Sequence, residues 1–231
     1  MTKQSPPPAA WKAIVAFSFG FFLPVSARRS MYRALLGYRI SPQANIGRAF
    51  IRVGMLEMAD GAHIGSLSII RNVDKVTLGK GAIIGTFNWI YGFPTGASEH
   101  FQEKGRASEL IMEEGSSLTS RHIVDCTNRV TIGAFTTVAG FYSQILTHGI
   151  DVRSNRQTSR PVTIGRYCLI GSRSTILKGA ILPEGTVLSA GSMFRGSPRE
   201  SHHIYSGAPA VPVRALNADE PYFTRIEGPV V

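Results

Sequence analysis

Aliphatic residues recur at every sixth position over long stretches of the chain, with small and polar residues between them. The pattern is most regular over residues 164–193, where the aliphatic positions are Ile164, Ile170, Ile176, Leu182 and Leu188. A small residue stands four places after each of these: Cys168, Ser174, Ala180, Thr186 and Ser192. Shorter pieces of the same pattern occur earlier, at Ile40 and Ile46, Met58 and Ile64, Leu78 and Ile84, Met112 and Leu118, and Ile132 and Val138. An α-helix requires a period of 3.6 and a half-buried strand a period of 2, so neither explains this pattern.

A period of six predicts a parallel β-helix in which three six-residue edges make one triangular coil. The aliphatic residue of each edge points into the prism and stacks on its equivalent one coil further along. The small residue fits where the interior is narrow. Because each coil buries its apolar side chains only against its neighbours, such a fold grows as a stack. We therefore expect an all-β domain, a parallel β-helix, over residues 39–214.

The six-residue register is interrupted at residues 90–109 and ends after Phe194. Such an interruption predicts a loop or short helix that projects from one edge of the coil. Insertions on one face of a repeat protein often form its binding surface. Residues 215–231 contain Pro, Asp and Glu and no further repeat, which predicts a C-terminal tail.

Residues 1–38 form a separate apolar and basic segment. Residues 13–23 are apolar but shorter than the roughly 20 residues that a membrane-spanning helix needs. A signal peptide is an alternative, which Arg28 and Arg29 directly after this stretch disfavour. A helix in the second half would place three apolar residues on one face: Met31, Leu35 and Tyr38. Such a helix either lies on a membrane surface or caps the first coil, and both interpretations fit the pattern.

The charge and the cysteine content indicate which kind of partner and which compartment to expect. The net charge is +10, and residues 1–40 hold no acid and six cations: Lys3, Lys12, Arg28, Arg29, Arg33 and Arg39. A basic segment beside apolar residues indicates an anionic membrane rather than nucleic acid. The two cysteines, Cys126 and Cys168, form no CxxC motif and lie within the repeats. This predicts packing residues in a reduced, cytoplasmic setting.

Two further motifs accompany the repeat. One is Leu146-Thr147-His148-Gly149-Ile150-Asp151, followed by Arg156 and Pro161-Val162-Thr163-Ile164-Gly165. The other is Gly207-Ala208-Pro209-Ala210 with Arg214. Together with the repeat, over residues 38–214, they resemble the hexapeptide-repeat acyltransferase family. The resemblance is closest to sugar O-acetyltransferases of the galactoside and maltose type and of the colanic acid and exopolysaccharide type. One departure is Leu169, where family members often have Trp.

The resemblance implies a left-handed coil, a homotrimer, acetyl-CoA as acyl donor, and a sugar or lipid-linked glycan as acceptor, with no metal. The hand rests on the resemblance alone, because crossovers between parallel strands are ordinarily right-handed. We therefore expect an acetyl-CoA-dependent O-acetyltransferase that acts on a surface polysaccharide or its precursor. Its expected location is the cytoplasm, including the inner face of the cytoplasmic membrane.

Acyl transfer to a hydroxyl requires a base, because a hydroxyl is a weak nucleophile until its proton is removed. A neutral imidazole suits this task near pH 7, and the resemblance assigns it to His148. Asp125 and Asp151 are candidates to orient the imidazole or to bind acceptor hydroxyls. Arg121 and His122, about one coil earlier, are further acceptor-site candidates. Each of these could equally face solvent at a repeat corner.

The resemblance places coenzyme A in a groove between adjacent subunits. Small residues would let pantetheine approach the backbone, and Arg173, Arg195 and Arg214 are candidates to meet its phosphates. The small-residue candidates are Gly171, Ser172, Ala190, Gly191 and Ala208. Because the turns of the coil themselves favour glycine, such residues identify the groove weakly.

Two alternatives to sugar O-acetylation stay open. One is transfer to the amine of an amino sugar on the same fold. The other is a β-helix that is catalytically silent or resembles the carbonic-anhydrase branch, which uses three histidines around zinc. His122 and His148 are present, but no convincing third histidine accompanies them, so the zinc alternative ranks lower.

Overall fold

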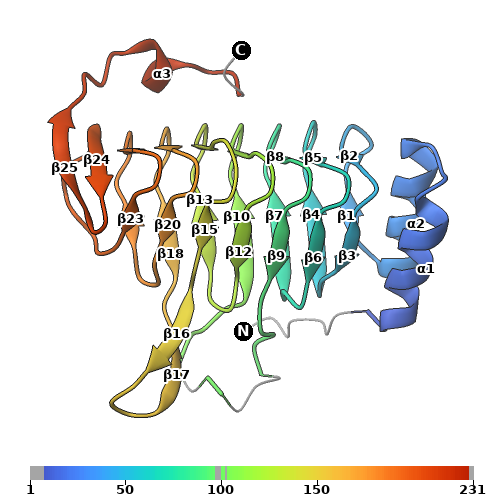
Figure 1. Cartoon of the computed structure of the whole chain (residues 1–231). Helices are drawn as coiled ribbons and strands as arrows, with labels where there is room; N and C mark the ends of the chain where they lie inside the picture. Colours follow the sequence, from blue (N-terminus) through green and yellow to red (C-terminus); the bar gives the residue numbers. More distant parts are fainter. Residues whose placement is uncertain (1–7, 97–99, 102, 229–231) are drawn as a thin grey trace.

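The computed structural model describes residues 8–96, 100–101 and 103–228 and shows a three-sided stack of short parallel strands (Figure 1). The first sheet contains β1 (Arg39–Ile40), β4 (Met55–Met58), β7 (Lys75–Leu78), β10 (Glu109–Met112), β13 (Val130–Ile132), β18 (Val162–Ile164) and β21 (Ile181–Leu182). The second contains β2 (Asn45–Ile46), β5 (His63–Ile64), β8 (Ile83–Ile84), β11 (Ser117–Leu118), β14 (Thr137–Val138), β19 (Leu169–Ile170), β22 (Val187–Leu188), β24 (His203–Gly207) and β25 (Ala210–Ala215). The third contains β3 (Phe50–Arg52), β6 (Ile69–Arg71), β9 (Trp89–Tyr91), β12 (Ile123–Asp125), β15 (Gln144–Ile145), β20 (Thr175–Ile176) and β23 (Met193–Phe194). This architecture confirms the predicted all-β parallel β-helix.

The six-residue period sets the register between coils. Where the repeat is regular, the residue paired with each aliphatic position lies three six-residue edges further on, as in Ile164–Leu182, Ile170–Leu188 and Ile176–Phe194. These side chains belong to one continuous buried apolar column. The small residues are buried too, at Ala44, Ala62, Ala82, Thr136, Cys168, Ser174, Ala180, Thr186 and Ser192. Both cysteines are free and buried, in agreement with packing roles.

Close stacking at the corners explains why glycine follows so many of the aliphatic residues. A Cβ built on Gly65 would lie 2.5 Å from the carbonyl carbon and oxygen of Gly85 in the next coil. No side chain fits at that distance, so these corners require glycine.

The N-terminal segment folds as two helices that close one end of the coil stack (Figure 1). They are α1 (Ala10–Gly20) and α2 (Val25–Leu36), and Tyr32 and Leu36 of α2 join the apolar column. Arg28 is buried and donates to the carbonyls of Gly20 at 2.7 Å and Ile46 at 2.8 Å. The segment therefore caps the first coil, which was one of the two interpretations. Within the described residues, neither helix has the length and hydropathy needed to cross a bilayer.

The C-terminal segment packs against the body instead of extending from it. After the antiparallel β24–β25 hairpin the chain turns back and forms α3 (Pro221–Thr224). The hydroxyl of Tyr222 donates to the Cys168 carbonyl at 3.0 Å, and that of Tyr167 donates to the Arg225 carbonyl at 2.8 Å.

Two excursions leave the stack at the same corner, between the third and first sheets (Figure 1). Residues 92–108 connect β9 to β10. Further along, β16 (His148–Asp151) and β17 (Arg156–Ser159) form an antiparallel hairpin between β15 and β18. The end of β12 lies at this corner too, on the coil between the two excursions. Three successive coils thus bring chemically distinct segments together at one place.

Candidate active site

The centre of the site is a pair formed by Asp125 and His148 from neighbouring coils. Asp125 is the last residue of β12 and is fully buried. His148 is the first residue of β16, where the chain leaves the coil. Its imidazole Nδ1 lies 2.6 Å from Asp125 Oδ2. With Nδ1 donating this hydrogen bond, Nε2 is the nitrogen that can accept a proton from a substrate.

Further hydrogen bonds hold the carboxylate of Asp125. Its Oδ1 accepts from the backbone N–H and the hydroxyl of Thr127, at 2.9 and 2.6 Å. Its Oδ2 accepts from the backbone N–H groups of Thr147 and His148, at 2.8 and 3.0 Å. The carboxylate therefore fixes the backbone at His148 as well as the imidazole, and the fold sets the orientation of the ring.

The two partners shift each other's pKa. Burial acts to raise the pKa of Asp125, but hydrogen bonds from His148 and Thr127 more than offset this, and the pKa is lowered. The hydrogen bond to Asp125 raises the pKa of His148, against burial and the charge of Lys178, which both lower it. Each partner thus favours the charged form of the other. The pair suits a general base whose imidazolium form is stabilised after proton transfer.

The excursion between β9 and β10 supplies an aromatic wall beside the imidazole. The rings of Phe93 and Phe101 meet the His148 ring edge-on, at centroid distances of 6.2 and 6.0 Å. Arg106 anchors the excursion, because its guanidinium donates to the carbonyls of Phe93 at 2.7 Å and Thr127 at 2.8 Å. The wall is therefore tied to the same segment that carries Asp125.

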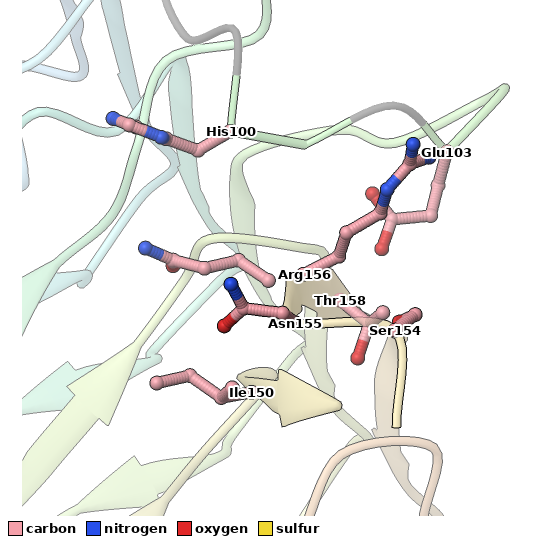
Figure 2. Close-up of a pocket in the computed structure, with 8 residues that line it drawn as sticks. His100, Glu103, Ile150, Ser154, Asn155, Arg156 and Thr158 are labelled. Atoms are coloured by element: carbon pink, nitrogen blue, oxygen red, sulfur yellow. The ribbon is translucent and has the colours of Figure 1, made fainter. Parts of the chain in front are cut away.

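A pocket of about 670 Å³ lies between this excursion and the β16–β17 hairpin (Figure 2). Its lining is mostly polar: His100, Glu103, Ile150, Ser154, Asn155, Arg156, Gln157 and Thr158. Ile150 lies two residues beyond His148 on β16, so the two side chains project from the same face of that strand. The pocket therefore borders the hairpin that begins at His148, and His148 itself lies outside the set of lining residues.

Glu103 joins the two walls of the pocket. Its Oε1 accepts a hydrogen bond from the backbone N–H of Ser159 on β17. Its Oε2 is buried and has no hydrogen-bond partner among the described residues. Figure 2 shows the Arg156 side chain extending toward Glu103. A buried carboxylate oxygen without a donor indicates that a ligand hydrogen could be accepted here.

His122 lies at a different corner and has a structural environment. It is buried, its Nδ1 accepts from the backbone N–H of Ser143 at 3.1 Å, and its Nε2 lies 2.9 Å from the hydroxyl of Thr119. Burial lowers its pKa to about 4. With both nitrogens engaged and almost no exposed surface, His122 holds the corner between β11 and β12. This corrects the expectation of an acceptor contact, and it also separates His122 from His148.

The structure places the other acceptor-site candidates in different environments. Asp125 is hydrogen-bonded to the imidazole, which is the geometry that an orienting role requires. Asp151 accepts from the backbone N–H of Arg153 at 3.0 Å, which lowers its pKa, and among the described residues it forms no hydrogen bond with His148. Arg121 is exposed at the His122 corner, where its guanidinium lies over neighbouring aromatic rings. The structure therefore does not bring Arg121 or Asp151 to the imidazole.

The small donor-site candidates meet at one corner, between the second and third sheets near the C-terminal end. The backbone N–H of Gly191 donates to the Ser172 carbonyl at 2.9 Å, and a Cβ on Gly171 would lie 2.5 Å from the backbone nitrogen of Ala190. The turn that contains Ala208 approaches this column, since the Gly207 N–H donates to the Ser192 hydroxyl at 3.1 Å.

The three arginine candidates are exposed but spread over different elements. Arg173 follows Ser172 at the corner of small residues between the second and third sheets. Arg195 follows β23, and Arg214 lies on β25. The structure thus groups the small residues and does not group the arginines.

Sequence reasoning did not identify Phe93, Phe101, Thr127 or Glu103. Phe93, Phe101 and Glu103 lie where the repeat register is lost, so no spacing indicates which of them faces the imidazole. Thr127, two residues after Asp125, could have been suspected, because a hydroxyl at that spacing commonly bonds an Asp side chain in a turn.

Comparison with known proteins agrees with this architecture. The family model described as the hexapeptide repeat of succinyl-transferase matches residues 161–193. The polysialic acid O-acetyltransferase OatWY is 14% identical, with a TM-score of 0.51 over 82% of this chain and 90% of that chain. AntD, an N-acyltransferase from Bacillus cereus solved with dTDP and coenzyme A, is 16% identical, with a TM-score of 0.48 over 82% and 89%. No curated protein matches the sequence.

A further structural relative is a hexapeptide-repeat acetyltransferase from Vibrio cholerae, solved with acetyl coenzyme A. It is 14% identical, with a TM-score of 0.45 over 90% of this chain and 86% of that chain. The family model and the fold shared with OatWY show that residues 161–193 carry hexapeptide repeats and that the chain has the left-handed β-helix fold. At these identities the likeness shows the fold, and the chemistry must be argued from the site.

Proposed function

We propose that the protein is an acetyl-CoA-dependent O-acetyltransferase that acts on a sugar hydroxyl of a surface polysaccharide or its precursor. The observation that carries this proposal is the buried Asp125 that holds Nδ1 of His148 at the base of the projecting hairpin. His148 Nε2 removes the proton of the acceptor hydroxyl, and the oxygen attacks the thioester carbonyl. Collapse of the tetrahedral intermediate breaks the carbon–sulfur bond, and the imidazolium returns the proton to the coenzyme A thiolate.

The acceptor site in this proposal is the pocket between the excursion and the hairpin. Its amide, carboxylate, guanidinium and hydroxyl groups match the donors and acceptors of a sugar. The unpartnered Oε2 of Glu103 is suited to receive a hydrogen from the acceptor. The fold shared with OatWY, a polysialic acid O-acetyltransferase, adds support for a glycan acceptor.

Transfer to an amine is the second candidate function. A buried carboxylate oxygen pairs with an ammonium group as readily as with a hydroxyl, so the Glu103 environment also suits an amino sugar. The two candidate functions differ only in the group that receives the acetyl group, which is a hydroxyl in one and an amine in the other.

The donor in this proposal follows the column of small residues formed by Gly171, Ser172, Ala190 and Gly191. This corner is not the one that carries His148, so in the proposed trimer the donor column of one subunit faces the His148 corner of its neighbour. Exposed backbone at such a corner allows close approach by pantetheine. The exposed arginines Arg173, Arg195 and Arg214 are the proposed phosphate contacts, and the Ala208 turn borders the column.

A direct assay tests the function. The purified chain is incubated with radiolabelled acetyl-CoA and matched neutral and amino sugars, and the products are treated with mild alkali. We expect acetyl transfer that alkali removes, because esters hydrolyse and amides survive under these conditions. An alkali-stable product would favour the amine acceptor, and no transfer to any sugar in the panel would contradict the proposal.

We also propose a homotrimer that works at the inner face of the cytoplasmic membrane, where acetyl-CoA is available. The outer face of the third sheet and its adjoining corner expose a group of large apolar side chains: Leu67, Ile69, Phe87, Trp89, Phe141 and Tyr142. The outer face of the first sheet carries ion pairs instead, such as Lys75–Glu57 at 2.7 Å and Arg129–Glu109 at 2.8 Å. An exposed apolar sheet face next to a polar one is typical of a subunit interface.

Trp89→Glu is therefore expected to dissociate the assembly. Burying a carboxylate in an apolar interface is strongly unfavourable, so light scattering should report a lower mass than for the wild type. The matched control is Ile181→Glu on the first sheet, because Ile181 and Trp89 have the same exposed fraction of 48%. Unchanged mass in Trp89→Glu, or equal loss in both variants, would contradict this interface.

A further inference from the structure

In helix α1 the buried side chains are small and several large apolar side chains are exposed, which reverses the usual distribution. The residues that it buries against the coil stack and α2 are small: Ala13, Ala16 and Gly20. Two of its large side chains are instead exposed, Trp11 at 60% and Phe19 at 68%, whereas Phe17 is half-buried and meets Phe50 of β3 edge-on. A helix that serves only as a cap would place its large apolar residues inside and its polar residues outside. The outer side of α1 is therefore an apolar surface that the described residues leave uncovered.

The apolar surface extends past the end of the helix into the turn before α2. Phe22 is 85% exposed, and Phe21 and Val25 are exposed beside it. We call this group the α1 outer face: Trp11, Ile14, Phe19, Phe21, Phe22 and Val25. These are six of the large exposed apolar residues, gathered within fifteen positions of the chain. Single exposed apolar residues are ordinary, but a group of this size marks an interaction surface.

Cations border the α1 outer face. The Lys12 ammonium lies 5.8 Å from the Trp11 ring centroid, and the Arg48 guanidinium lies 5.3 Å from the Phe21 ring centroid. The first acidic residue in the sequence is Glu57. A second copy that packed through the same surface would bring these cations together, whereas anionic lipid headgroups would complement them.

We propose that the α1 outer face lies in the interfacial region of an anionic bilayer, with its aromatic side chains at the boundary of the acyl chains. Trp and Phe on one side of a short helix, bordered by Lys and Arg, are the features of a helix that lies in the membrane plane. The inference deepens the proposed location of the enzyme, but the lipid contact does not depend on acyl transfer.

Hydrogen bonds fix α1 to the first coil, so contact of α1 with a membrane would hold the whole protein at the membrane surface. The buried Arg28 side chain donates to the carbonyls of Gly20, Leu23 and Ile46. These bonds tie the end of α1 and the following turn to the first coil. A bilayer that holds α1 therefore holds the β-helix with it, and no flexible linker of described residues intervenes.

Co-sedimentation of the full chain with vesicles tests the proposal without any substrate. The vesicles are phosphatidylcholine alone and phosphatidylcholine mixed with phosphatidylglycerol. We expect binding to the mixed vesicles that weakens with salt, and a loss of at least about tenfold in the triple variant Trp11→Ser, Phe19→Ser, Phe22→Ser. Ile226→Ser is the matched control, since Ile226 is 86% exposed and lies far from α1 in the sequence. Because all replaced side chains point to solvent, thermal unfolding should be unchanged.

Tryptophan fluorescence locates the contact. The chain has two tryptophans, so Trp89→Phe leaves Trp11 as the reporter. On mixed vesicles its emission should shift to shorter wavelength, and brominated acyl chains should quench it. Three results would overturn the proposal: wild-type binding by the triple variant, no shift of Trp11 emission, or a lower mass of the triple variant in vesicle-free solution, which would assign the surface to a second copy. Failure of acetyl transfer with intact vesicle binding would instead bear on the proposed function alone.

Discussion

His148→Ala should lower kcat/KM for acetyl transfer by at least about a hundredfold and leave the fold intact. The variant removes the proposed base together with its contact to the buried carboxylate of Asp125. Its structural effect should be small, because Asp125 Oδ2 keeps its hydrogen bonds from the backbone N–H groups of Thr147 and residue 148. Because the acceptor is a charged carboxylate, the loss of this side-chain hydrogen bond should lower the free energy of unfolding by about 2 kcal/mol.

The measurement compares initial rates of coenzyme A release and urea unfolding for wild type and variant. His63→Ala is the control, because His63 lies on β5 of the second sheet, away from the excursion corner. We expect wild-type rates for this control. Retention of activity in His148→Ala, with His63→Ala also active, would show that another group removes the proton.

The fold could be predicted because one physical requirement repeats along the chain. Every third edge must place an aliphatic side chain over its equivalent, as Ile170 stands over Leu188. The period therefore appears directly in the sequence. The hand of the coil does not appear there, because the same inward pattern fills a prism of either hand.

The sequence offered both Asp125 and Asp151 as partners of His148, and spacing could not choose between them. Ile123 of β12 pairs with Gln144 of β15, so this coil is three residues longer than the regular one (21 against 18). Extra residues at its corners shift everything that follows, and His148 reaches Asp125 only through that shift. His122 shows the opposite error, because a histidine in a regular corner can be buried with both nitrogens satisfied.

The N-terminal segment shows a third limit of sequence patterns. Capping and membrane contact were treated as alternatives, yet the two sides of α1 differ in character. The side that packs on the coil stack buries Ala13, Ala16 and Gly20, with Phe17 against Phe50 at its edge, and the opposite side exposes Trp11 and Phe19. Hydrophobic periodicity cannot reveal this difference, because both sides of the helix are apolar and differ mainly in side-chain size.

Asp125→Asn should reduce both activity and stability, with a larger effect on each than a surface substitution. The amide presents one acceptor oxygen and an NH₂ group where the carboxylate accepts from Thr127, Thr147 and His148. If the NH₂ group donates to His148 Nδ1, the proton moves to Nε2 and the base is blocked. We expect kcat to fall by about 10²–10⁴-fold and the free energy of unfolding near neutral pH to fall by about 3 kcal/mol.

The substitution Asp125→Asn should also change the pH dependence of the free energy of unfolding. The folded-state pKa of Asp125 is lowered from 3.8, so its contribution is present above that value and lost as pH falls through the folded pKa. Wild type should therefore lose stability in acid more steeply than Asp125→Asn. Parallel acid unfolding curves would contradict this assignment of the charge.

The pH–rate profile distinguishes a positioning role from a general loss of folding. The base must be neutral, so kcat/KM rises with pH through the pKa of His148. That pKa is raised from 6.5, chiefly by the hydrogen bond to Asp125. In Asp125→Asn the remaining influences, burial and Lys178, both lower the pKa. The acid limb of the residual activity should therefore move to lower pH, while a merely destabilised enzyme would keep the wild-type limb.

A double-mutant cycle then tests whether Asp125 acts through His148. If the carboxylate serves to orient and charge-stabilise the imidazole, its removal matters only while the imidazole is present. The variant Asp125→Asn, His148→Ala should therefore have the same residual rate as His148→Ala alone. Independent, multiplying losses would show that Asp125 contributes to turnover by another route, and the pair could no longer be treated as one catalytic unit.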